Sequence, residues 1–165
     1  MFQWAFIGAG AIARTVAEEI TANGHGIAAV YSRTPARAAE LAQKCGASAC
    51  KSLEELLHGG ADAVYIATPH ASHYPYLLAC IGAGVPVLCE KAFTVNAEQA
   101  KRAANFARER GVLVMEGMWT RFLPLAKELR RIAAGEIGQI RSVEAEFSTG
   151  FSSSRAGRPL RLFRP

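Results

Sequence analysis

The residues with the clearest chemical meaning form a glycine-rich run near the N-terminus, Gly8-Ala9-Gly10-Ala11-Ile12-Ala13. The run fits the pattern G-x-G-x-x-A, whose first glycine permits a tight turn and whose second lets the backbone approach a pyrophosphate. Its last residue, Ala13, is small enough for a helix to pack closely on a strand. Where such a run ends a strand and opens a helix, the first N–H groups of the helix bind phosphate oxygens. The pattern therefore predicts a dinucleotide site at Gly8, Ala9, Gly10, Ala11 and Ile12.

Two alternatives stay open for this run. A glycine-rich turn between a strand and a helix can occur without any ligand. Methyltransferases that bind adenosylmethionine also use a similar glycine loop. The residues that follow the second strand help to separate these possibilities.

The second strand ends in Tyr31-Ser32-Arg33-Thr34. NAD-binding proteins usually carry an Asp or Glu at this place, about 20 residues after the glycines, to hold the ribose 2′-hydroxyl. Here there is no carboxylate; Arg33 offers a planar cation suited to a phosphate, with hydroxyls from Ser32 and Thr34 beside it. Arg37, one helical turn further on, adds a second charge. The segment predicts NADP, with NAD as the alternative cofactor and a solvated loop arginine as the alternative without a ligand.

A third group of residues, Cys89-Glu90-Lys91-Ala92, follows another buried strand. Ligands of open α/β sheets bind at the carboxyl ends of the strands, so a lysine there can reach over a nicotinamide ring. Its ammonium could hold and polarise the oxygen of an alcohol or carbonyl substrate. The alternative is an ordinary exposed lysine at the end of a strand.

These groups need a framework that brings strand ends together. Short apolar runs rich in β-branched residues alternate with helical segments, which is typical of a parallel sheet covered on both faces. We expect strands at residues 4–8, 27–31, 63–67, 85–89 and 112–118. Helices are expected at residues 11–23, 35–44, 74–81 and from Asn96 to Gly111, with a short helix opened by the capping box Ser52-Leu53-Glu54-Glu55. The fold class predicted is α/β, a doubly wound Rossmann sheet over residues 1–118.

The character of the sequence changes after residue 118. A helix is expected at residues 124–134, closed by Gly135, and a strand at residues 140–147 with an unpaired edge. We interpret residues 119–147 as the beginning of a second, incomplete α+β domain. Residues 148–165 show no periodicity and form an irregular basic tail.

Four ordered motifs within residues 1–147 together resemble the glucose–fructose oxidoreductase/inositol dehydrogenase (Gfo/Idh/MocA) family. They are the glycine run at residues 8–13, Thr68-Pro69-His70-Ala71-Ser72-His73, the run Val87-Leu88-Cys89-Glu90-Lys91-Ala92-Phe93-Thr94, and Met115-Glu116-Gly117-Met118-Trp119-Thr120-Arg121-Phe122. The last two resemble in particular the branch of dimeric dihydrodiol dehydrogenases and NADP-linked D-xylose dehydrogenases.

The resemblance implies a two-domain enzyme that transfers a hydride to or from a nicotinamide, with a sugar, polyol or trans-dihydrodiol as substrate. It implies that Glu90 and Lys91 are the family's Glu-Lys pair at the cofactor, that Lys91 is also catalytic, and that full-length members form homodimers. Along the ribose and nicotinamide it places Thr68, Pro69 and His73; beside the substrate it places Trp119 and Arg121. Alternatives without a ligand are a helix-start role for His73 and a core position for Trp119.

Two departures from the family pattern bear on activity. The family usually has Glu-Lys-Pro, whereas position 92 is alanine, which we expect to loosen the backbone that aims Lys91. The family's second domain carries a D-x-G-x-[HY] motif that supplies an acid/base partner, and no such motif occurs in this sequence. The alternative function is therefore a truncated cofactor-binding module without catalytic activity.

Composition excludes several other classes. The net charge is +5, but four of the 19 basic residues lie in the tail; without them 15 basic residues face 14 acidic ones. This near-neutral body does not support a nucleic-acid surface, so such a binder would have to work through the tail. No apolar run approaches the roughly 20 residues of a membrane helix, and the N-terminus lacks a signal peptide's features, so we expect a cytoplasmic protein. The four cysteines lack metal-ligand spacing, which predicts no metal site.

Overall fold

The computed structural model describes residues 1–146 of the chain. It divides into a compact unit at Met1–Phe122 and a second unit that begins at Leu123. The two units are described separately below.

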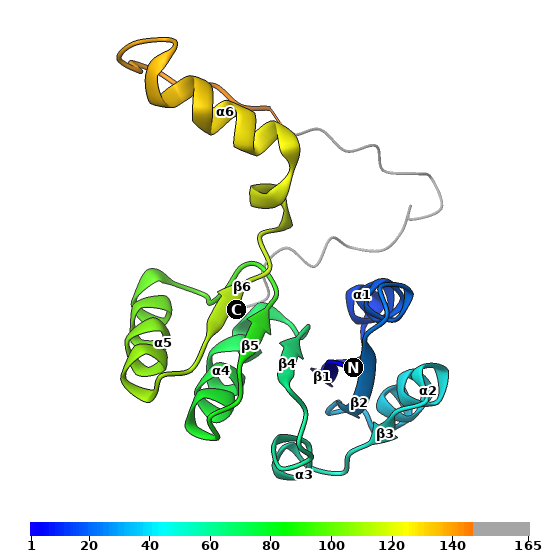
Figure 1. The fold of residues 1–165 in the computed structure, drawn as a ribbon. Coiled ribbons are helices and arrows are strands. Elements are labelled where there is room, and N and C mark those ends of the chain that lie inside the picture. Colours follow the sequence, from blue (N-terminus) through cyan, green and yellow to red (C-terminus); the bar gives the residue numbers. More distant parts are fainter. Residues whose placement is uncertain (147–165) are drawn as a thin grey trace, which may run out of the picture. The chain divides into compact units, whose positions relative to one another are not determined.

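The first unit is built on a single sheet of six parallel strands (Figure 1). The strands are β1 (Gln3–Ile7), β2 (Gly26–Tyr31), β3 (Ser48–Ala49), β4 (Ala63–Ile66), β5 (Val87–Cys89) and β6 (Val114–Glu116). Their order across the sheet is β3-β2-β1-β4-β5-β6. The chain winds outward in one direction to β3 and then crosses back to β4, which creates a switch point between β1 and β4. This topology confirms the predicted Rossmann fold.

Helices connect successive strands and cover both faces of the sheet. They are α1 (Ala11–Ala22), α2 (Pro35–Cys45), α3 (Leu53–Leu57), α4 (His73–Gly82) and α5 (Ala97–Arg110), with 3-10 turns η1 (His70–Ser72) and η2 (Trp119–Phe122). Local capping explains where two of them begin. The Oγ of Ser52 accepts a bond from the Glu55 N–H at 3.0 Å, and the Oδ1 of Asn96 accepts one from the Gln99 N–H at 2.9 Å.

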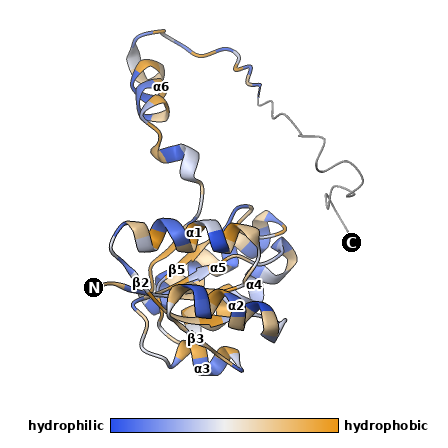
Figure 2. Ribbon diagram, turned by 90° about the vertical axis from the view of Figure 1, so that its right-hand side faces the viewer, coloured by the Kyte–Doolittle hydropathy of each residue, from blue (hydrophilic) through white to orange (hydrophobic). Residues whose placement is uncertain are grey.

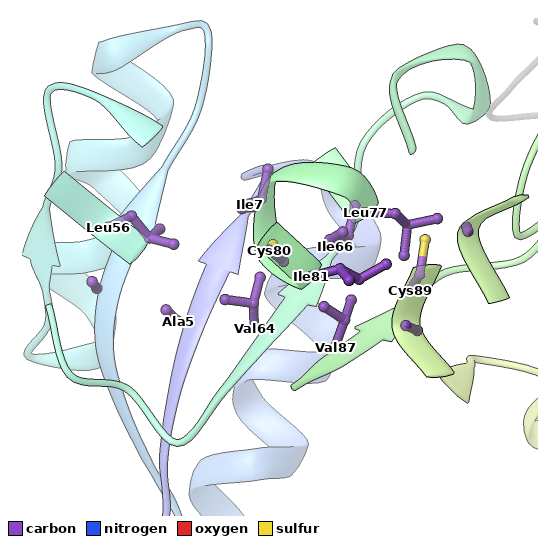
Figure 3. Packing of buried hydrophobic residues seen from close by; sticks show 13 residues of the cluster. Ala5, Ile7, Leu56, Val64, Ile66, Leu77, Cys80, Ile81, Val87 and Cys89 are labelled. Carbon is purple, nitrogen blue, oxygen red and sulfur yellow. The ribbon is translucent and has the colours of Figure 1, made fainter. Parts of the chain in front are cut away.

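Strand residues alternate between two apolar cores, because neighbouring side chains of a strand point to opposite faces. One core lies under α3, α4 and α5 and is shown in Figure 3; it includes Ala5, Ile7, Val64, Ile66, Leu77 and Ile81. The other lies under α1 and α2 and includes Phe6, Ala13, Ala17, Val30, Leu41 and Tyr65. In Figure 2 the strands between the helices are mainly hydrophobic, while the helices carry hydrophilic residues. The small side chain of Ala13, fully buried, lets α1 pack closely on the sheet.

The expected elements of this unit occur, with strands that are shorter than the apolar runs suggested. The sixth strand covers only Val114–Glu116 of the expected 112–118, and β3 and η2 were not anticipated. Within residues 1–146, no helix is both long and apolar enough to cross a membrane.

In the second unit, helix α6 runs from Pro124 to Gly135, as the sequence predicts. The expected strand at residues 140–147 is wrong over residues 140–146, which adopt no strand conformation. A strand needs a neighbour to satisfy its backbone groups, and the described part of this unit offers none. Phe147 and the tail at 148–165, with its four arginines, lie outside the described residues.

Candidate functional site

The predicted site residues of the first unit gather at one edge of the sheet. All six strands are parallel, so the segments that follow β1, β2, β4, β5 and β6 leave the sheet at the same carboxyl edge (Figure 1). This edge, at the β1–β4 switch point, is where open α/β sheets bind ligands. The fold thus brings together four motifs that are far apart in the sequence.

Gly8 forms the turn from β1 into α1. Its φ is +109°, a conformation that side-chain-bearing residues rarely adopt. An added Cβ would overlap the carbonyl oxygen of Ala67, the residue after β4, and lie 2.8 Å from its carbonyl carbon. The N–H of Gly8 donates to the Tyr31 carbonyl at 2.8 Å, which ties the turn to the end of β2. Gly8 is therefore required by the packing of three strand ends.

Gly10, in contrast to Gly8, is not required by backbone strain or by a close protein contact. Its φ of −81° and ψ of −174° are open to any residue, and an added Cβ would meet no protein atom within 4 Å. It is the N-cap of α1, whose first turn receives no side-chain capping bond and contains no acidic residue. No side chain therefore caps the first N–H groups of α1, and the space around a Cβ built at Gly10 is open. That space fits a pyrophosphate, since a Cβ would fill part of it and the helix dipole favours an anion.

The neighbours of Gly10 differ in what they can offer. Ala9 is 4% exposed and belongs to the core under α1 and α2, so only its backbone faces the edge. Ala11 is exposed, and Ile12 is 47% exposed in the first turn of the helix. The glycine loop therefore presents mainly backbone donors.

The segment after β2 carries positive charge at the same edge. Arg33 and Arg37 are exposed, and neither takes part in an ion pair among residues 1–146. The Ser32 Oγ accepts a hydrogen bond from the Thr34 N–H at 3.2 Å, which shapes the turn into α2. Burial raises the pKa of the nearby Tyr76 hydroxyl, and the charge of Arg33 acts in the opposite direction. No carboxylate of this segment would repel a second phosphate.

The segment after β5 begins at Glu90, which forms hydrogen bonds with two residues of β4. The Glu90 N–H donates to the Ile66 carbonyl at 2.9 Å, and its Oε1 accepts from the Tyr65 hydroxyl at 2.8 Å. Burial, followed by the hydrogen bond to Glu90, raises the pKa of Tyr65, so this hydroxyl stays protonated and donates. Glu90 is thus fixed by a residue of the sheet interior.

Lys91 itself is exposed at the edge, and the peptide bond to Ala92 is cis. The next residue, Phe93, donates its N–H to the Oε1 of Glu116 at 2.9 Å, and the Gly117 N–H donates to the Cys89 carbonyl at 2.7 Å. Hydrogen bonds to the Glu116 carboxylate and between backbone groups therefore hold the chain before and after Lys91.

The segment after β4 contains one fully buried polar residue. The Nδ1 of His73 lies 2.9 Å from the Ala92 carbonyl oxygen and its Nε2 lies 2.9 Å from the Thr68 carbonyl oxygen. Thr68 is half-buried and Pro69 exposed, both at the edge. His73 is thus buried at the first residue of α4, and both of its ring nitrogens lie within hydrogen-bonding distance of backbone carbonyls.

The two expected substrate residues lie after β6, in η2. Trp119 is 59% exposed, so within the described part of the chain it is not a core residue. Arg121 is exposed as well. A cavity of about 350 Å³ lies instead between α5 and β6; its lining, which includes Phe93, Ala107 and Val114, is apolar apart from Arg108 and Glu116. That cavity lacks the grouped backbone donors of the glycine loop.

Comparison with known proteins agrees with the Rossmann fold of the first unit. The family model described as oxidoreductase family, NAD-binding Rossmann fold (Gfo/Idh/MocA) matches residues 2–118. The chain belongs to the Gfo/Idh/MocA family. The match ends where β6 leaves the sheet, so the family assignment rests on the same strands that build the edge.

Among curated Gfo/Idh/MocA relatives, the chain is 40% identical to trans-1,2-dihydrobenzene-1,2-diol dehydrogenase of Mus musculus, over 94% of this chain and 48% of the relative. It is 35% identical to D-xylose 1-dehydrogenase (NADP(+)) of Hypocrea jecorina, over 97% of this chain and 45% of the relative. A 3-ketoreductase from Actinomadura kijaniata, solved in complex with NADP, has a TM-score of 0.74 and 30% identity, over 85% of this chain and 46% of that one. The chain spans about half the length of the curated relatives it matches.

Two residues of this Gfo/Idh/MocA edge were missed by the sequence analysis, Tyr65 and Glu116. Each supports the segment around Lys91 from a neighbouring strand. Tyr65 had one signal, a hydroxyl within the otherwise apolar run of residues 63–67. Glu116 had a similar one, a carboxylate within the otherwise apolar strand expected at residues 112–118. Neither signal indicates which residue the side chain contacts. The contacts depend on the order of β4, β5 and β6 in the sheet, and the local sequence does not reveal that order.

Proposed function

We propose that this chain binds NADP at the carboxyl edge and serves an oxidoreductase that transfers a hydride to or from a sugar, polyol or trans-dihydrodiol. The observation that carries the proposal is the open, uncapped start of α1 at Gly10, beside an arginine that has no described carboxylate partner. The names of the relatives, a diol dehydrogenase and an NADP-linked sugar dehydrogenase, support the substrate class.

In this proposal the two ends of the edge bind different parts of the dinucleotide. The N–H groups of Ala11 and Ile12, with the backbone of Gly8–Gly10, hold the pyrophosphate. Arg33 and Arg37, with the hydroxyls of Ser32 and Thr34, hold the 2′-phosphate of the adenosine ribose. NAD remains the alternative cofactor, since these backbone donors do not distinguish the two.

The nicotinamide end lies by Thr68, Pro69 and Lys91, and the bound nicotinamide supplies or accepts the hydride. The Lys91 Nζ–H donates a hydrogen bond to the oxygen of the substrate, which orients the alcohol or polarises the carbonyl. Trp119 and Arg121 border the substrate as an aromatic wall and a polar group. Glu90, held by Tyr65, fixes the start of the segment that presents Lys91.

Gly10→Ala tests the pyrophosphate position with little risk to the fold. We expect the dissociation constant for NADPH to rise on the order of ten-fold or more, because the new methyl occupies space that the phosphates need; such a change corresponds to about 1.4 kcal/mol. The free energy of unfolding should fall by about 1 kcal/mol at most, as for a poorer N-cap residue. Fluorescence titration with NADPH and urea denaturation measure the two quantities.

The matched control is Gly82→Ala. Gly82 also has open space around a built Cβ, but it lies at the end of α4, away from the glycine loop. It should bind NADPH like the unaltered chain. If both variants bind NADPH equally well, the pyrophosphate does not lie at Gly10.

A second candidate function is cofactor binding without catalysis. It is favoured by the sequence, which contains no D-x-G-x-[HY] motif to supply the family's acid/base partner, and by His73, which is buried against the backbone. A panel of sugars, polyols and diols with NADP separates the two functions. We expect binding with little or no turnover by this chain. Turnover that disappears in Lys91→Met, with NADPH affinity kept, would instead assign the complete reaction to it.

A further inference from the structure

Two tyrosine rings meet on one face of the sheet, near the segment that carries Arg33. Tyr31 is the last residue of β2, and Tyr76 lies in the first turn of α4. Their ring centroids are 6.4 Å apart and the ring planes are inclined by 75°, which is the edge-to-face arrangement that aromatic pairs favour. Both residues are half-buried and pack on the core under α3, α4 and α5. The pair therefore joins the end of β2 to α4.

This contact joins two parts of the fold that do not pair in the sheet. In the strand order, β1 lies between β2 and β4, and α4 follows β4 in the chain (Figure 1). The backbone of Tyr31 is held as well, because its carbonyl accepts a hydrogen bond from the Gly8 N–H at 2.8 Å. The end of β2 is thus fixed twice, by its carbonyl to the turn after β1 and by its ring to α4.

Arg33 lies two residues beyond this fixed point. The chain between them forms a short turn, in which the Ser32 Oγ accepts a hydrogen bond from the Thr34 N–H at 3.2 Å. The charge of Arg33 also reaches Tyr76, because burial raises the pKa of the Tyr76 hydroxyl and the guanidinium opposes that rise. An exposed arginine has many rotamers, so the place where its backbone leaves the turn limits the positions that its guanidinium can reach.

We propose that Tyr76 is a specificity-determining residue for the cofactor: its ring, packed on Tyr31, positions the turn that presents Arg33 to the 2′-phosphate. Tyr76 acts through Tyr31, so it is a positioning residue. A turn that is already fixed loses less conformational entropy when Arg33 binds a phosphate, which favours NADPH and leaves NADH unaffected. What Arg33 binds rests on the proposed function, whereas the contact between the rings does not.

The preference for NADPH over NADH separates positioning from general stability. Both dinucleotides share the pyrophosphate, and in the proposed function both use the donors at the start of α1. A general loosening of the fold should therefore weaken both dinucleotides together and leave the ratio of their affinities unchanged. Loosening of the turn that carries Arg33 should weaken NADPH alone, because NADH has no 2′-phosphate.

The first experiment titrates Tyr76→Leu with NADPH and with NADH. Leucine keeps an apolar side chain that suits a helix but removes the ring. We expect the preference for NADPH over NADH to fall about three- to ten-fold, the contribution of one aromatic pair, with NADH affinity kept within about two-fold. Tyr76→Phe keeps the ring and should keep the preference within about two-fold.

The matched control is Phe106→Leu. Phe106 is a half-buried aromatic residue of α5 that packs on the same core, so its loss tests general stability. It should leave the ratio of the two affinities unchanged. An unchanged ratio in Tyr76→Leu, or an equal fall of the ratio in Phe106→Leu, would overturn the proposal.

A second measurement, ¹⁵N relaxation of the Arg33 amide, needs no cofactor. We expect an order parameter of about 0.85 in the unaltered chain and in Tyr76→Phe, and one below about 0.6 in Tyr76→Leu. A mobile Arg33 amide in the unaltered chain would overturn the proposal even if the variants do not fold, as would an equally rigid amide in Tyr76→Leu. If the unaltered chain binds neither dinucleotide, the proposed function fails, and the order parameters alone decide whether the ring contact fixes the turn.

Discussion

Gly8→Ala is expected to unfold the first unit or to lower its free energy of unfolding by roughly 3 kcal/mol or more. Two costs add at this position. The φ of +109° is strained for alanine, and the new methyl would overlap the Ala67 carbonyl at the junction of β1 and β4. Both strands lie in the middle of the sheet, so neither can move away without breaking its pairing with a neighbour. Urea denaturation followed by circular dichroism measures the loss.

Gly46→Ala separates the two costs. Gly46 also has a positive φ, +65°, but a Cβ there meets nothing within 4 Å. We expect this variant to lose about 1 kcal/mol from the backbone strain alone. If Gly8→Ala loses no more than Gly46→Ala, the close approach of the turn to Ala67 does not constrain the fold.

Arg33→Ala is expected to weaken NADPH binding roughly 10- to 150-fold and to leave NADH binding unchanged. The size follows from losing a charged hydrogen-bonding partner, worth about 1.5–3 kcal/mol. The loss of affinity is specific to NADPH because only NADPH carries a phosphate on the 2′-oxygen. The segment around Arg33 contains no carboxylate to hold the free 2′-hydroxyl of NADH. Parallel titrations with NADPH and NADH measure the ratio.

Arg102→Ala controls for the change in net charge. Arg102 lies on α5, where it pairs with Glu98, and its removal should alter neither affinity. Salt screens exposed charges, so it should weaken the preference of the unaltered chain for NADPH over NADH. In Arg33→Ala this preference should change less with salt, because the charge of Arg33 is gone. Equal weakening of NADPH and NADH by Arg33→Ala would mean that the arginine does not read the 2′-phosphate.

The sheet was predictable because its signals are local. Alternating apolar strands and capped helices define each unit of the fold, and the Ser52 and Asn96 caps form as their motifs indicate. Strand ends were less predictable. The mainly apolar run extends from Val112 to Met118, but only Val114–Glu116 of it forms a strand. The expected strand at residues 140–147 failed over its described part because alternation alone does not supply a partner.

Some residues of the candidate site could also be predicted from local sequence, and others could not. Gly8, Gly10 and Arg33 could be selected because the chemistry of each depends on a motif of neighbouring residues. The roles of Tyr65, Glu116 and His73 depend on contacts across strands, such as the bonds from Tyr65 to Glu90 and from His73 to Ala92. Such contacts become visible only once the order β1-β4-β5-β6 is known.

The central claim is that the start of α1 and Arg33 together bind the phosphates of NADP. Calorimetric titration of the unaltered chain with NADP and, separately, with NAD tests it most directly. We expect both to bind at one site, with NADP the tighter by a factor of about ten or more, the value of one charged hydrogen bond. Tighter binding of NAD would contradict the role of Arg33, and no heat from either dinucleotide at millimolar concentration would contradict the site itself.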